Sequence, residues 1–214
     1  PSRWQAERDV RRHLAIGVAC AAALGLPSIA AALPSPLAPK CRIFPADNAW
    51  NRDVSQLPVA ANSAVMIRSI GTDANLHPDF SNAGRYGIPF NVVPRTHATA
   101  RVSFEYAAES DRVRYPIPTK PAIERGSDRH ILIIDRYRCK LYELFAARRV
   151  SGRWRAGSGA VYDLNSSRVR PLGWTSADAA GLPIFPGLAR YDEVAKGEIA
   201  HALRFTAPRT RKSY

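Results

Sequence analysis

The sequence predicts a mainly β domain, either an antiparallel sandwich or a barrel-like sheet, with one or two short helices. Three observations favour this class. Several short segments alternate apolar and polar residues with the period of two that marks a half-buried strand. Helical patterns are few, and 17 prolines divide the chain into short elements. With 214 residues, of which 46% are hydrophobic, the chain can bury one core of ordinary size.

The N-terminal segment has the features of an export signal. A basic cluster at residues 8–13 precedes a long uncharged stretch that contains the small-residue motif Ala30-Ala31-Ala32. This order predicts a signal peptide over residues 1–32. A membrane-spanning helix is the alternative, but Pro27 and the many alanines argue against permanent insertion. We expect no stable membrane insertion once the signal has been cleaved. We therefore expect a secreted or periplasmic protein, exported by the general secretory route or by a twin-arginine signal at Arg11-Arg12.

A proline-rich linker is expected at residues 33–40, and a single β-rich domain at residues 41–214. Removal of the signal would also remove Cys20, which leaves Cys41 and Cys139. An even pair of cysteines in an exported protein favours one disulfide, with two buried free thiols as the alternative.

The first half of the domain predicts one helix and two strands. Residues 62–70 form a short helical pattern between Asn62 and Gly71, which fit an N-cap and a glycine stop. Residues 86–93 predict a strand that Pro89 restricts to a sheet edge or a bulge. Residues 102–107 alternate apolar and polar side chains, as a half-buried strand does.

The second half predicts a buried hairpin and a second helix. The apolar run at residues 131–135 indicates a central strand buried on both faces, and residues 139–145 follow closely enough to pair with it. Residues 191–196, before Gly197, predict a short helix. Residues 198–205 predict a strand, because alternate residues from Ile199 to Phe205 share an apolar face.

Common catalytic motifs are missing from the sequence. It contains no P-loop, zincin, nucleophile-elbow or paired-cysteine redox motif, which argues against the enzyme classes that depend on them. A polar, glycine-rich stretch from Ala156 to His201 instead gathers several side chains that can carry chemistry. Dense polar loops of this kind favour an active or binding cleft over a purely structural role.

The same stretch carries a recognisable combination of motifs. These are AGSGA at residues 156–160, DLNS at 163–166, GWTSADAAGLPI at 173–184, RYDEV at 190–194 and GEIAHALRFT at 197–206. The combination resembles a largely uncharacterised family of secreted bacterial proteins, and the likeness extends over nearly the whole mature chain. Members of that family sometimes occur beside carbohydrate-binding modules. They continue beyond Tyr214, so the resemblance implies that the domain is truncated at its C-terminus.

Carboxylates in this stretch suggest carbohydrate chemistry. Glycoside hydrolysis needs two carboxyl groups that face each other across the scissile bond. The catalytic candidates are Asp163, Asp178, Glu198 and His201. For each carboxylate the alternative is a turn or helix cap. His201 shares an apolar face, so it is either a core histidine with a buried partner or a group that lines a cavity.

A second group of residues is suited to holding a sugar. The face of Trp174 is suited to stacking against a pyranose ring. The substrate-binding candidates are Trp174, Arg190, Tyr191, Asp192, His77 and His130. His77 and His130 could also join Asp79 or Asp128 at a metal, but their long spacing is not a metal signature, and no cofactor is expected.

Composition narrows the choice of partner. The formal net charge is +13, and of the 31 basic residues 26 are Arg and five are Lys. Such a skew fits a GC-rich coding sequence, and the arginines are scattered along the chain, so we expect no nucleic-acid partner. The sequence predicts a secreted protein that hydrolyses a polysaccharide with paired carboxylates. The alternative is a non-catalytic module that binds a carbohydrate or another cell-envelope glycan.

Overall fold

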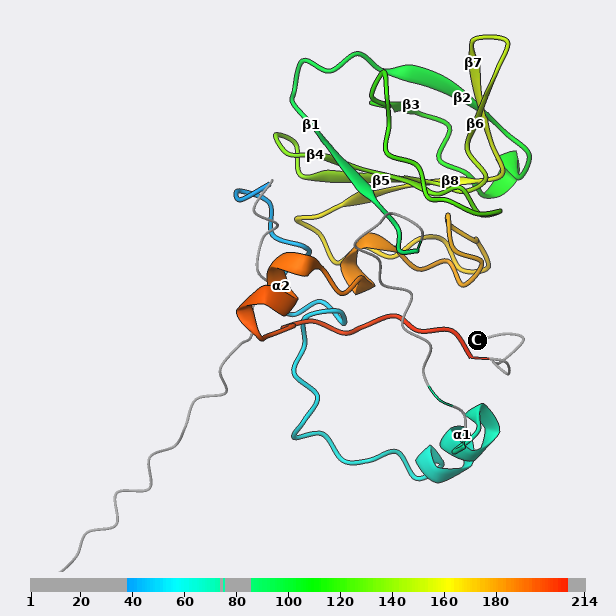
Figure 1. The fold of residues 1–214 in the computed structure, drawn as a ribbon. Helices are drawn as coiled ribbons and strands as arrows, with labels where there is room; N and C mark the ends of the chain where they lie inside the picture. The colour runs from blue at the N-terminus through cyan, green and yellow to red at the C-terminus, as the bar shows by residue number, and fades with distance from the viewer. Residues whose placement is uncertain (1–37, 74, 76–85, 208–214) are drawn as a thin grey trace, which may run out of the picture.

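Two four-stranded sheets form the centre of the computed structural model, which describes residues 38–73, 75 and 86–207 (Figure 1). The first sheet has the strand order β1-β4-β5-β8, and the second has the order β3-β2-β7-β6. The strands are β1 (Phe90–Val93), β2 (Ala100–Phe104), β3 (Arg114–Tyr115), β4 (Ile131–Asp135), β5 (Lys140–Leu144), β6 (Arg148–Val150), β7 (Arg153–Ala156) and β8 (Gly159–Asp163). The predicted signal peptide at residues 1–32 lies outside the described residues, as do residues 33–37 of the predicted linker.

Strand pairing in both sheets is mainly antiparallel, as expected, with one parallel pair in each. The parallel pairs are β1 with β4 and β2 with β7, whereas the other paired strands run antiparallel. Neither sheet closes into a barrel over the described ranges. Of the two architectures that the sequence predicts, the sandwich is the one that forms.

One hydrophobic core fills the space between the two sheets. Ile131 and Ile133 of β4 pack in the same cluster as Tyr115 of β3, and Phe104 of β2 packs against this cluster. Across the gap between the sheets, the rings of Tyr115 and Tyr142 of β5 meet edge to face with their centroids 5.6 Å apart. Side chains from facing strands therefore interlock, as they do in a sandwich.

A second core covers the opposite face of the first sheet. Leu132 and Ile134 pack there against Ile43 and Phe185. These partners come from residues 38–51 and 164–207, which have little regular structure and which we call the loop layer. Figure 1 shows the loop layer below the first sheet, with the second sheet above it. All five residues of β4 are at most 2% exposed, which confirms the predicted central strand buried on both faces.

Both predicted helices form. Helix α1 (Ser63–Ile70) buries none of its residues, whereas α2 (Tyr191–Lys196) belongs to the loop layer and ends at Gly197, whose φ of 77° is left-handed. Two single-turn 3-10 helices lie at Ala107–Glu109 (η1) and Phe185–Gly187 (η2). No helix in the described part of the chain is both long and apolar enough to cross a membrane.

The predicted strand at residues 198–205 is wrong. This segment belongs to neither sheet and is part of the loop layer (Figure 1). Its backbone makes isolated hydrogen bonds, from Ala202 N to Trp50 O at 2.7 Å and from Arg204 N to Gly187 O at 3.0 Å. The alternating pattern is real, but the neighbouring segments are irregular and offer no ladder of donors and acceptors.

The other strand predictions hold with shifted boundaries. β1 begins directly after Pro89 and lies at the edge of its sheet, and β4 and β5 form the predicted hairpin. β2 ends at Phe104, before the predicted end at residue 107. Strands β6, β7 and β8 were not predicted, because arginines interrupt the apolar alternation of the first two and glycine and alanine open the third.

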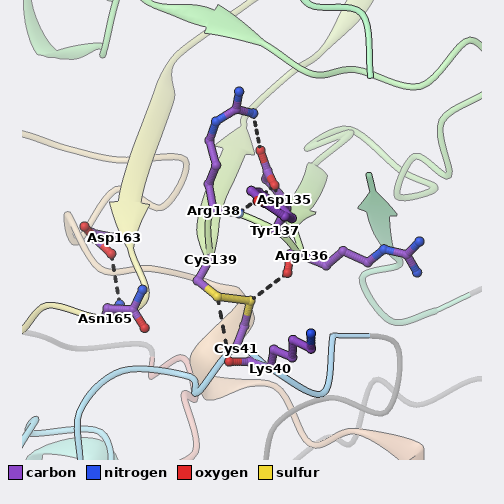
Figure 2. Close-up of a disulfide and its surroundings, with 9 residues drawn as sticks. All are labelled: Lys40, Cys41, Asp135, Arg136, Tyr137, Arg138, Cys139, Asp163 and Asn165. Atoms are coloured by element: carbon purple, nitrogen blue, oxygen red, sulfur yellow. Dashed lines mark hydrogen bonds and ion pairs between the residues drawn. A yellow bond between two sulfur atoms is a disulfide. The ribbon is translucent and has the colours of Figure 1, made fainter. Parts of the chain in front are cut away.

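The predicted disulfide joins Cys41 to Cys139, 98 residues apart in sequence (Figure 2). Cys139 lies in the turn between β4 and β5, where its φ is 50°. Cys41 lies at the start of the loop layer and is fully buried. The bond therefore fastens the first segment of the loop layer to the central hairpin.

Replacing both cysteines by serine should lower the free energy of unfolding by about 4 to 5 kcal/mol, because a cross-link across so long a loop removes much of the entropy of the unfolded chain. Denaturant unfolding of the double variant C41S/C139S measures this loss. The unmodified protein in excess reductant is the matched control and should lose a similar amount. A loss below about 1 kcal/mol would contradict the role given to the bond.

Candidate functional site

An open pocket of about 650 Å³ lies beside the end of β8. Its wall combines that strand, the start of β5 and the loop at residues 166–174. The lining residues are Asp111, Lys140, Val161, Tyr162, Asp163, Ser166, Arg168, Val169, Arg170, Pro171 and Trp174. Two residues predicted for the site, Asp163 and Trp174, are thus brought together.

Asp163 is held as an anion at the pocket wall. Lys140 is its cross-strand neighbour and donates a hydrogen bond from Nζ to Oδ2 at 2.7 Å. The backbone N–H of Asn165 donates to Oδ1 at 3.0 Å and starts the turn that ends β8. These hydrogen bonds lower the pKa of Asp163. The carboxylate is therefore a hydrogen-bond acceptor at neutral pH, with two-fifths of its side chain exposed.

Arg170 organises the loop that carries Trp174. Its guanidinium donates to Asp111 Oδ2 at 2.5 Å, to Glu109 O at 2.7 Å and to Thr175 O at 3.0 Å. It also lies over the ring of Trp174, with Cζ 5.4 Å from the centroid. Since these contacts join the loop to residues 109–111, Arg170 fixes the position of the Trp174 ring.

Glu109 supplies a second anchor for the same loop. Its Oε2 accepts hydrogen bonds from Thr175 Oγ1 at 2.7 Å and from Thr175 N at 3.0 Å. These bonds lower the pKa of Glu109, the bond from the hydroxyl having the larger effect. The loop that follows Arg170 is therefore tied to η1 through both Thr175 and Arg170.

The remaining predicted residues lie outside the lining of this pocket. Asp178 pairs with Arg204 and caps a turn by accepting a hydrogen bond from Ala180 N at 2.9 Å. Glu198 is exposed on the segment after α2, and Tyr191 is 87% exposed on α2 itself. His77 lies outside the described residues.

Helix α2 begins in a buried ionic cluster. Arg190 precedes the helix and pairs with Glu193, and both side chains are at most 3% exposed. His201 Nε2 lies 3.1 Å from Glu193 Oε1, and its Nδ1 donates to Ala202 O at 2.8 Å. Asp192 Oδ1 is 3.9 Å from Arg190 Nε. His201 therefore has the buried partner that one of its two predicted roles requires, and with Arg190 it holds the segments on either side of α2 together.

His130 directly precedes β4 and contacts the loop layer. Its Nδ1 is 2.5 Å from Glu124 Oε2, and its Nε2 is 3.0 Å from Ala177 O. Both ring nitrogens face acceptors, so the imidazolium form satisfies both contacts. Burial alone would lower the pKa of His130, but the hydrogen bond and charge of Glu124 outweigh burial and raise it. Since both ring nitrogens have hydrogen-bond partners, the role of His130 is to hold Ala177 in place.

Sequence reasoning missed Glu143, which is fully buried on β5. Its carboxyl group accepts hydrogen bonds from Ile184 N at 2.9 Å and from Phe185 N at 2.8 Å. Burial raises the pKa of Glu143 to about 7, although these two hydrogen bonds oppose the shift. An available signal was its position in a predicted strand, two residues from Leu141 and so on the same buried face.

Within the described ranges, no three His, Cys, Asp or Glu side chains gather closely enough to hold a metal ion. Comparison with protein-family models, with curated proteins and with solved structures finds no match to this chain. The family resemblance drawn from the motifs therefore stays a prediction.

Glu143 should make the protein less stable as the pH rises. Its pKa is about 7 in the folded state against 4.5 for an ordinary glutamate, so the folded state holds a proton that the unfolded chain has released between these values. Stability should therefore fall by about 3 kcal/mol from pH 4.5 to 7 and then level off. The raised pKa of His130 acts in the same direction, because its contribution is present at low pH and lost above its folded pKa.

The variant E143Q isolates the part due to the carboxyl group. Thermal unfolding from pH 5 to pH 8 should show a smaller decline in midpoint for E143Q than for the unmodified protein. The exposed Glu198 provides the control variant E198Q, which should keep the original slope. Equal slopes for E143Q and the unmodified protein would show that Glu143 does not take up a proton in this range.

Proposed function

We propose that the pocket beside β8 binds a carbohydrate without cleaving it. The observation that carries this proposal is the placing of Trp174 and Asp163 in one open pocket. An indole face suits the apolar side of a sugar ring, and a fixed carboxylate accepts hydrogen bonds from its hydroxyl groups. The contacts of Arg170 hold the Trp174 loop in place before any ligand arrives, which lowers the entropy lost on binding.

The chemistry of the pocket favours binding over hydrolysis. A glycosidase needs one carboxyl group that stays protonated and a second that is ionised on the other side of the bond. The carboxyl groups that line the pocket belong to Asp111 and Asp163, and each accepts a hydrogen bond from a cation, Arg170 or Lys140. The carboxyl group with a raised pKa, that of Glu143, is fully buried and does not line the pocket.

The disulfide supports a location where such a ligand is encountered. Disulfides persist in oxidising compartments such as the periplasm and the cell exterior. Cys41–Cys139 is therefore consistent with the export that the N-terminal residues predict. Glycans of the cell envelope or of the surroundings are the candidate ligands in those places.

A glycan array followed by titration of the best ligand tests this function. The variant W174A should raise the Kd about tenfold or more, because it removes the stacking surface. Y191A is the matched control, since Tyr191 is an exposed aromatic residue outside the pocket lining, and it should bind as the unmodified protein does. Unchanged binding by W174A would refute the proposal.

Turnover is measured in the same preparations by the release of reducing ends from the bound glycan. We expect no release by the unmodified protein. Release that disappears in D163N would instead support the hydrolytic alternative and would overturn the proposal of binding alone.

A further inference from the structure

The outer face of the second sheet is open to solvent. Its inner face packs Val102, Phe104 and Trp154 against the core between the sheets. Figure 1 shows no segment of the described chain across the opposite side of β3-β2-β7-β6. The residues that alternate with the packed ones along each strand therefore form a free surface.

This outer face is lined by arginines. Arg101 of β2 lies opposite Arg114 of β3 in the strand register. Arg155 of β7 lies opposite Arg148 of β6, and Arg153 is two residues from Arg155 and so shares its face. All five residues are exposed. We call these five residues the arginine face.

The arginine face has no carboxylate within its own strands, although the exposed Glu105 directly follows β2. The four strands contain 14 residues in all (2 + 5 + 4 + 3), of which six are Arg and none is Asp or Glu. Within the described part of the chain, none of the five arginines forms an ion pair. Arg114 donates to Thr99 Oγ1 and O, at 2.8 and 2.6 Å, and neither of these acceptors is a carboxylate.

A GC-rich coding sequence explains Arg in place of Lys but not this arrangement. The five residues come from four strands and lie up to 54 positions apart in sequence (155 − 101), yet the register brings them to one side of one sheet. Like charges on neighbouring strands destabilise a sheet. Such an array is tolerable on a free surface and becomes favourable when a polyanion covers it.

The spacing of the array suits a repeating anion. Neighbouring strands lie about 4.8 Å apart, and side chains on one face repeat about every 6.6 Å along a strand. The planar guanidinium matches carboxylate, sulfate and phosphate groups with two parallel hydrogen bonds. An extended polymer with one anionic group on every monomer unit, or on every second one, can therefore engage several of the five arginines together.

We propose that the arginine face binds an acidic polysaccharide. The disulfide favours this partner over nucleic acid, because disulfides persist in compartments where acidic glycans are common. None of the five arginines lines the pocket beside β8, so this surface is separate from the carbohydrate pocket and does not depend on it. A polymer held on this face would keep the protein at an anionic surface and leave the pocket beside β8 free.

Binding to dextran sulfate and to polygalacturonate, with neutral dextran as reference, tests the proposal. The triple variant R101Q/R153Q/R155Q should raise the Kd for both acidic polymers at least tenfold and reduce the dependence of affinity on salt. The control variant R52Q/R68Q/R125Q removes the same charge from exposed arginines elsewhere and should change the Kd less than threefold. Thermal unfolding of both variants shows whether each is folded.

Three results would overturn the proposal. Equal losses in the two triple variants would show that net charge alone attracts the polymer. Equal binding of neutral dextran would remove the role of charge. Tighter binding of duplex DNA than of either acidic polysaccharide at the same salt concentration would identify nucleic acid as the partner. The variant W174A should bind dextran sulfate normally, which separates this result from failure of the pocket proposal.

Discussion

The burial of β4 on both faces is the constraint on which the rest of the structure depends. Ile131 and Ile133 need a covering layer on one side, and the second sheet supplies it. Leu132 and Ile134 need another on the opposite side, where the described residues form no third sheet and the loop layer packs instead. The loop layer therefore contributes side chains to the hydrophobic core. This arrangement places polar backbone against an apolar sheet, where each N–H and C=O needs a partner.

Buried polar side chains supply those partners. Glu143 accepts the backbone N–H groups of Ile184 and Phe185, and Asn51 donates to the carbonyl oxygens of Ile43 and Pro45 at 2.8 and 3.0 Å. Within the loop layer itself, Asp178 accepts a hydrogen bond from the backbone N–H of Ala180 at 2.9 Å. Asp178 and His201, which the sequence predicts as catalytic groups, thus make structural contacts in the loop layer. The pocket beside β8 lies at the exposed edge of that layer.

How far the sequence predicts the structure depends on whether a pattern is local. The hairpin of β4 and β5, both helices and the disulfide follow from short segments whose composition decides their state. β7 does not, because Arg153 and Arg155 face solvent and leave Trp154 as the main apolar signal. Trp174 and Asp163 were predicted as site residues, but their pocket also needs Lys140 and Asp111, which lie far away in sequence. Glu143 shows the limit most clearly, since its buried surroundings come from a loop 41 residues later.

The two parallel strand pairs also determine when the sandwich can form. β1 joins β4 across 42 positions (132 − 90), and β2 joins β7 across 52 (154 − 102). Contacts between such distant segments require loop closure before they gain stabilisation, so folding is slow compared with that of a chain of local hairpins. Until residue 156 has emerged, β2 has only the two-residue β3 as a partner. A chain of this topology therefore stays open until the last strand of each sheet is available to pair.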